Sequence, residues 1–154
     1  MSLGLNEDLA AVRGELDRAR QEVQASLDQL TDEDLDRSRR GGWSVRRVVQ
    51  HLIQSEWHYA RLVSHLRGLQ PTPPLAPPTS PASVPDAVRA LSAARQALLD
   101  ALDGIDEASF YRLGTVGREE YSVLSVLENA AHHDREHVQQ IRSIVAPTYD
   151  RNQR

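Results

Sequence analysis

The sequence predicts an all-α fold, a single four-helix-bundle domain that spans residues 1–154. Apolar residues recur at three- and four-residue steps in four long segments, which is the period of an amphipathic helix. Little of the chain shows the alternation of apolar and polar residues that is typical of strands. A chain of 154 residues suits one domain, and it can bury roughly two-thirds of its unfolded surface without a disulfide or a structural metal.

The first helix is expected over residues 5–30. Asn6 is expected to cap it, because an asparagine side chain accepts a hydrogen bond from the free amides of the first turn. The turn LTDEDL follows, and Gly41 and Gly42 then prevent a continuous helix. The apolar positions of this helix are Leu5, Leu9, Val12, Leu16, Val23, Leu27 and Leu30.

The second helix is expected to begin at Ser44, whose hydroxyl can accept from the free amides. Trp43 precedes it and can pack on Val48 as a hydrophobic staple. The helix is expected to end at Gly68, since glycine readily adopts the left-handed conformation that ends helices.

A long crossover is expected between the second and third helices. Residues 69–85 hold seven of the eight prolines, and proline fits neither a helix interior nor a central strand. The third helix is expected from Ser83, which has capping-box spacing with Asp86, to about Asp103. We therefore predict a semi-rigid, proline-rich connection between the two helices.

The fourth helix is expected from near Ser122 to about Val145, with Pro147 ending it. The spacing of apolar and polar residues predicts no secondary structure for residues 104–120, which precede this helix. A faint internal repeat supports the arrangement, because LTDEDL before GGWSV resembles GIDEASF before EEYSV. Two helical pairs joined by a long crossover predict a bundle that is not simply up-down-up-down.

The charge of the chain disfavours nucleic acid as its partner. The formal net charge is −4 and the sequence pI is about 5.8, whereas a phosphate backbone requires a strongly basic face. All 18 basic residues are arginine. A cluster within RSRRGGWSVRR is either a small anion-binding patch or, more simply, a solvated helix start. Its members are Arg37, Arg39, Arg40, Arg46 and Arg47.

The chain contains no cysteine, which excludes disulfides, thiolate metal sites and a cysteine nucleophile. Any metal must therefore be held by histidine, carboxylate or water. The apolar runs are far shorter than the roughly 20 residues that span a bilayer, and the N-terminus lacks the apolar core of a signal peptide. We expect a soluble, cytoplasmic protein that is not bound to a membrane.

Histidines are the strongest candidates for a functional site. In HHDREH, residues 132–137, helical geometry places His133 and His137 within or at the edge of the apolar sector and His132 nearly opposite. Histidines four apart on one helix can bind a single metal ion, although such pairs also arise by chance. His51 lies at the border of the apolar face of the second helix, where it is either a ligand or a histidine bonded to water or backbone.

Two carboxylates also fall on apolar faces, where an unpaired charge is costly. Glu56 lies near the middle of the apolar face of the second helix, and Asp134 points inward from the fourth. Each can either accept a hydrogen bond from the second ring nitrogen of a metal-bound imidazole and so orient it, or form an internal ion pair with an arginine.

Other metal motifs fit poorly. Residues 133–137 match the H-x-x-E-H pattern of inverzincin proteases, but only 17 residues follow His137 and Glu136 points off the face of the histidine pair. A di-iron site needs two Glu-x-x-His motifs, and only Asp134-x-x-His137 approximates one. No glycine-rich phosphate loop or nucleophile elbow is present.

Two short blocks resemble a known family. GGWSVRRVVQHL, in which His51 follows Ser44 by seven residues and precedes Glu56, and HDREHVQQI, residues 133–141, resemble the DinB-like (YfiT-type) superfamily. The resemblance implies a four-helix bundle with a divalent metal ion, zinc, nickel or iron, bound by His51, His133 and His137. Three protein ligands would leave coordination positions open, as in catalytic sites.

The resemblance also implies an activity. Related branches use low-molecular-weight thiols such as mycothiol or bacillithiol, so a thiol S-transferase, or otherwise a metal-dependent hydrolase, is expected. The alternative is a non-catalytic, stress-related bundle that binds a metal or a small molecule. A small-molecule substrate is the expected partner, and exposed apolar residues would support a homodimer.

Overall fold

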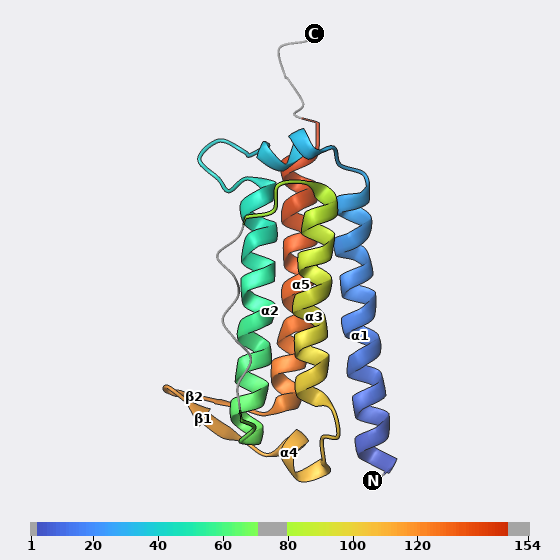
Figure 1. The fold of residues 1–154 in the computed structure, drawn as a ribbon, viewed down its shortest axis with the longest axis vertical. Coiled ribbons are helices and arrows are strands. Elements are labelled where there is room, and N and C mark those ends of the chain that lie inside the picture. The colour runs from blue at the N-terminus through green and yellow to red at the C-terminus, as the bar shows by residue number, and fades with distance from the viewer. Residues whose placement is uncertain (1–2, 71–79, 148–154) are drawn as a thin grey trace.

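The structure is a computed structural model that describes residues 3–70 and 80–147. Within these residues, four long helices form the bundle, and short elements lie at its two ends (Figure 1). No helix in the described part of the chain is long and apolar enough to cross a membrane. The elements are α1 (Leu3–Asp28), η1 (Asp32–Asp36), α2 (Val45–Arg67), α3 (Val84–Leu102), α4 (Glu107–Tyr111), β1 (Gly114–Val116), β2 (Glu119–Tyr121) and α5 (Val123–Val145).

The helices do not alternate in direction. In Figure 1, α1 and α5 run toward one end of the bundle, whereas α2 and α3 run toward the other. The main packing pairs are α1 with α5, α2 with α3, and α2 with α5. The prediction of a bundle that is not up-down-up-down is confirmed. Most of the predicted crossover, residues 71–79, lies outside the described residues.

Local capping explains where three of the long helices begin. The side chains of Ser44, Ser83 and Ser122 each accept a hydrogen bond from the backbone amide three residues later. Gly68 ends α2 with a φ of 68°, a conformation that only glycine adopts without strain. The predicted ends of these helices are confirmed.

The first helix begins earlier than predicted. It starts at Leu3, so Asn6 lies inside the helix and the predicted cap is wrong. Leu5 is fully buried and packs into the core, and this burial extends the helix beyond the position that the asparagine suggested.

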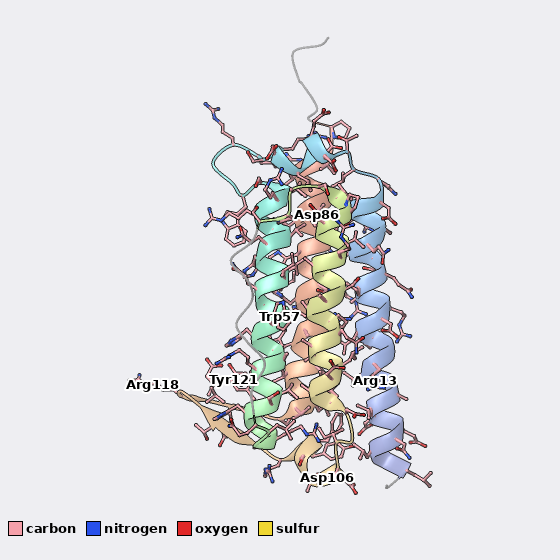
Figure 2. All side chains as sticks on the ribbon, in the orientation of Figure 1. Arg13, Trp57, Asp86, Asp106, Arg118 and Tyr121 are labelled. Carbon is pink, nitrogen blue, oxygen red and sulfur yellow. The ribbon has the colours of Figure 1, made fainter. Side chains whose placement is uncertain are left out.

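The segment before α5 contains structure that the patterning did not show. Asp106 caps the short helix α4, and its carboxylate accepts from the amide of Ser109 at 2.7 Å. Strands β1 and β2 then pair antiparallel around a two-residue turn that begins at Gly117, whose φ is 65°. The fold is thus predominantly helical with one small hairpin, which projects from the bundle with Arg118 at its tip (Figure 2).

The core divides into two apolar clusters along the bundle axis. One cluster contains Leu16, Ala60 and Leu98, and the other contains Val23 and Leu52. Buried charged residues lie between the two clusters on α2, α3 and α5, and the partly buried Arg20 of α1 joins them. This polar layer lies at the level of the candidate site.

Candidate metal centre

Three predicted histidines meet between α2 and α5. His51 comes from α2, and His133 and His137 come from successive turns of α5. His133 Nε2 lies 3.0 Å from His51 Nε2 and 2.9 Å from His137 Nε2. One ring nitrogen of each residue lies within 4.8 Å of the others, so the three could hold one ion.

Aromatic rings hold the imidazoles in place. The ring of His51 meets those of His133 and His137 edge to face, each at 4.9 Å between centroids. Trp43 packs against His51 at 5.3 Å, and Tyr59 packs against His133 at 6.1 Å. His51 and His133 are therefore each packed against an aromatic side chain as well as against the other histidines.

The chemistry of the three nitrogens fits a cation. His133 Nε2 carries either one hydrogen or one lone pair, so it cannot form full hydrogen bonds with both of its neighbours. A cation would accept a lone pair from all three nitrogens. Neutral imidazole nitrogens are ligands that divalent metal ions prefer, so His51, His133 and His137 would hold such an ion together.

Gln140 fixes the tautomer of His137. The Nδ1–H of His137 donates to Gln140 Oε1 at 2.7 Å, which leaves the Nε2 lone pair facing the other histidines. The sequence interpretation did not assign this role to Gln140. Its position three residues after His137 on the same helix face is the signal that could have revealed it.

His51 and His133 are held in the uncharged form near neutral pH. Burial, followed by the proximity of His137 and His51, lowers the pKa of His133 from 6.5 to about 4. Burial and the proximity of His137 also lower the pKa of His51. Neutral imidazoles are the form that binds metal ions.

A cavity of about 300 Å³ adjoins His133. Burial and nearby carboxylates raise the pKa of Tyr59 to about 12, so its phenol stays protonated at neutral pH. The residues that line the cavity are His58, Tyr59, Leu62, Tyr121, Val126, Asn129, His132, His133 and Glu136.

His132 is exposed, as predicted, and its Nε2 lies 3.0 Å from Glu136 Oε1.

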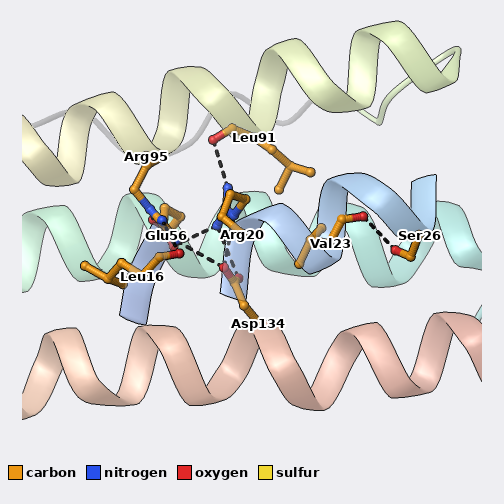
Figure 3. Close-up of polar contacts among 8 residues, drawn as sticks. All are labelled: Leu16, Arg20, Val23, Ser26, Glu56, Leu91, Arg95 and Asp134. Carbon is orange, nitrogen blue, oxygen red and sulfur yellow. Dashed lines mark hydrogen bonds and ion pairs between the residues drawn. The ribbon is translucent and has the colours of Figure 1, made fainter. Parts of the chain in front are cut away.

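Glu56 and Asp134 belong to a buried cluster of four charges, which we call the charge tetrad (Figure 3). Arg20 contacts Asp134 at 3.0 Å and Glu56 at 3.2 Å. Arg95 contacts Asp134 at 3.1 Å and donates through Nε to Glu56. Each long helix contributes one member, so the tetrad joins the whole bundle.

The tetrad is neutral overall, and its hydrogen bonds are satisfied. Arg95 also donates to the carbonyl of Leu16 at 3.1 Å, and Arg20 donates to that of Leu91 at 3.0 Å. Burial alone would lower the pKa of Arg20, but the charges of Glu56 and Asp134 outweigh it and raise this pKa. In the described part of the chain, no buried side-chain nitrogen or oxygen lacks a partner.

The observed contacts of Glu56 and Asp134 match the internal ion pair that the sequence left as an alternative to a metal-orienting role. Asp134 nevertheless follows the ligand candidate His133 directly, so the tetrad anchors the turn of α5 that presents this imidazole. The partners Arg20 and Arg95 were missed. Both interrupt apolar helix faces, which is the signal that could have identified them.

Comparison with known proteins identifies the family. The family model of the DinB superfamily matches residues 8–141, which is most of the chain. The chain belongs to the DinB superfamily. The resemblance seen in the sequence is confirmed, and the superfamily is one associated with metal ions.

Solved structures show the same fold at low sequence identity. This DinB superfamily member is similar to a DinB-like protein from Bacillus cereus ATCC 10987, with a TM-score of 0.68, 18% identity and coverage of 94% of this chain and 97% of the other. It is also similar to TT2238, described as a four-helix bundle protein, with a TM-score of 0.67, 21% identity and coverage of 90% and 98%. No curated protein matches significantly.

Proposed function

We propose that this protein is a metal-dependent enzyme that binds zinc, nickel or iron through His51, His133 and His137 and transfers a low-molecular-weight thiol. The convergence of three imidazole nitrogens, 2.9 and 3.0 Å apart in succession, is the observation that supports the site. Membership of the DinB superfamily supports the assignment of these residues as metal ligands.

The arrangement suits an enzyme because, among residues 3–70 and 80–147, three protein ligands converge. When bound there, a divalent metal ion supplies Lewis acidity that lowers the pKa of a thiol or of water and so provides a nucleophile at neutral pH. The cavity beside His133 gives a second reactant room to approach, and the protonated Tyr59 phenol can donate a hydrogen bond within it.

The proposed reaction is a substitution in which the thiol sulfur replaces a leaving group on carbon. The thiol loses its proton to solvent, and its sulfur forms a bond with an electrophilic carbon while the leaving group departs with its electron pair. The chain has no cysteine, so the cosubstrate brings the sulfur. The cytoplasm, where thiols are kept reduced, is the compartment that this proposal requires.

The first experiment measures metal content by plasma mass spectrometry in untagged protein. We expect near-stoichiometric metal in the wild type and loss of metal in His51→Ala, His133→Ala and His137→Ala. His132→Ala is the control, because this exposed histidine lies one position from a ligand yet points away. Absence of metal after reconstitution with zinc, nickel or iron would contradict the proposal.

Thiol dependence separates the transferase from the other functions. The loaded protein is mixed with mycothiol or bacillithiol and an electrophilic substrate, and the thioether product is quantified. Product that requires both metal and thiol supports the transferase. Product formed with water alone indicates a hydrolase, and metal binding without turnover indicates a binding protein.

A further inference from the structure

A row of polar residues runs along the face of α2 that carries the candidate ligand. Arg47, His51, Ser55 and Tyr59 follow one another at four-residue intervals. Side chains four apart on a helix lie one above the other, so Arg47 lies one turn before His51 on the same face.

An aromatic contact connects this arginine to the site. The guanidinium carbon of Arg47 lies 4.6 Å from the centroid of the Trp43 ring. The same tryptophan packs against His51 at 5.3 Å between ring centroids. Through these two contacts, the positive charge of Arg47 lies close enough to His51 for one small molecule to reach both residues. Stacking on Trp43 also restricts the positions that the guanidinium can adopt.

Arg47 differs from the neighbouring arginines in the partner that it contacts. Arg46 pairs with Asp36 at 3.2 Å, and Arg37 pairs with Asp34 at 3.5 Å. Among residues 3–70 and 80–147, by contrast, no carboxylate forms an ion pair with Arg47, whose contact is with an aromatic ring. Within these residues its guanidinium donors have no acceptor and can bind a ligand, and an exposed arginine is well suited to binding a planar anion.

We propose that Arg47 is the anion-recognising residue of the metal site, and that the ligand of this site carries a carboxylate or a similar anionic group near the atom that binds the metal. The inference rests on the proposed function and specifies the substrate class. It extends the anion-binding alternative for residues 37–47 by assigning that role to one residue and joining it to the histidines.

The surrounding charges favour such a ligand. The chain as a whole carries a net charge of −4, but five arginines lie within residues 37–47, and two of them are paired with carboxylates. The other three, Arg39, Arg40 and Arg47, form no ion pair with a described residue. A local positive field raises the concentration of small anions near the site and speeds their binding, and salt weakens both effects.

The test compares two thiols of equal length, one anionic and one neutral. Cobalt-loaded protein is titrated with mercaptopropionate and with mercaptopropanol, and the sulfur-to-cobalt absorption bands report binding. We expect Arg47→Met to weaken mercaptopropionate binding about tenfold, the effect of losing one charge-assisted hydrogen bond, and to change mercaptopropanol binding less than about twofold.

Arg118→Met is the matched control, because it removes the same charge at the projecting hairpin tip (Figure 2). It should leave both affinities unchanged, and Arg47→Lys should restore part of the preference for the anion. Equal effects of Arg47→Met on both thiols, or no effect on either, would overturn the inference while leaving the metal site intact. Failure of the wild type to bind cobalt would instead overturn the proposed function, and this inference with it.

Discussion

Gln140 determines which nitrogen of His137 is free. Its Oε1 accepts the Nδ1–H at 2.7 Å, so the lone pair of His137 lies on the nitrogen that faces His133. Partners of this kind raise the basicity of a ligand and fix the plane of its ring. Metal affinity should therefore depend on a residue that does not contact the ion.

Replacing Gln140 with leucine tests this dependence. We expect Gln140→Leu to lower metal affinity between about 10- and 100-fold in chelator competition, because His137 loses its hydrogen-bond acceptor. Gln139→Leu introduces the same change at the neighbouring exposed position and should have little effect. Similar affinities for the two variants would show that Gln140 does not orient the ligand.

Acid should destabilise the metal-free protein through His133. Its pKa is 6.5 in the unfolded chain and about 4 in the fold, so between these pH values the unfolded state binds more protons. The free energy of unfolding should therefore fall as pH decreases from about 6.5 to 4. Urea denaturation at several pH values measures it, and His133→Asn, which does not titrate, should show a weaker dependence. An identical dependence in both proteins would contradict the assignment.

The sequence predicted the three histidines but could not decide the role of the carboxylates. His133 and His137 lie on one helix face, and His51 was added by the family resemblance. Glu56 and Asp134 were ambiguous because their arginine partners lie on other helices, far away in sequence. Helical periodicity identifies a buried charge but not the side chain that pairs with it.

Helix α2 carries one candidate ligand, and its start is fixed locally. The hydroxyl of Ser44 accepts from the amide of Arg47 at 3.1 Å, and Trp43 packs in the same apolar cluster as Val48. The cap and the packing of Trp43 thus fix where α2 begins, and with it the position of His51 on the helix.

Ser44→Ala should lower the free energy of unfolding by about 1 kcal/mol, because the first turn of α2 loses its side-chain acceptor. Ser92→Ala, at an exposed position inside α3, is the control and should change stability by less than about 0.5 kcal/mol. Chemical denaturation measures both. An equal stability of the two variants would show that the cap contributes nothing measurable.

Sequence patterning succeeded for elements whose ends depend on nearby residues. The serine caps and Gly68 act within one turn, so they were visible in the sequence. The hairpin at residues 114–121 was not, because three-residue strands are too short to show a period. Its position also depends on α2, since a side chain at Gly114 would clash with Leu66 at 2.7 Å.

At the level of the whole molecule, the charge tetrad joins all four long helices between two apolar clusters. Such buried charges need not add stability relative to apolar residues, but removing one leaves an opposite charge without compensation. The tetrad should therefore respond differently to single and to paired substitutions.

We expect Arg95→Met to lower the free energy of unfolding by about 3–5 kcal/mol, because Glu56 and Asp134 then share only Arg20. The double variant Arg95→Met/Glu56→Met removes opposite charges and should be more stable than Arg95→Met alone. Arg89→Met removes an exposed arginine from the same helix and should change little. Denaturation of all variants measures the effect. A double variant less stable than the single would contradict this account.

The tetrad also repeats the internal order of the chain. Glu56 lies twelve residues after the cap Ser44, and Asp134 lies twelve residues after the cap Ser122. Arg20 precedes Thr31, the cap of η1, by eleven residues. The two halves therefore carry their acidic residues at equivalent positions.

The arginines obey the same rule, because Arg95 precedes Asp106, the cap of α4, by eleven residues. Each half thus supplies one cation and one anion, and each cation contacts both anions. Two identical half-length chains related by a twofold axis would form the same set of ion pairs.

The histidines do not share this symmetry. The position equivalent to His51 in the second half is Asn129, and the position equivalent to His133 in the first half is Ser55. A symmetric pair of half-length chains would keep its central ion pairs but could not assemble this set of three imidazoles. The charge tetrad is the part of the interior that a gene duplication could produce unaltered, whereas the metal centre requires the two halves to have diverged.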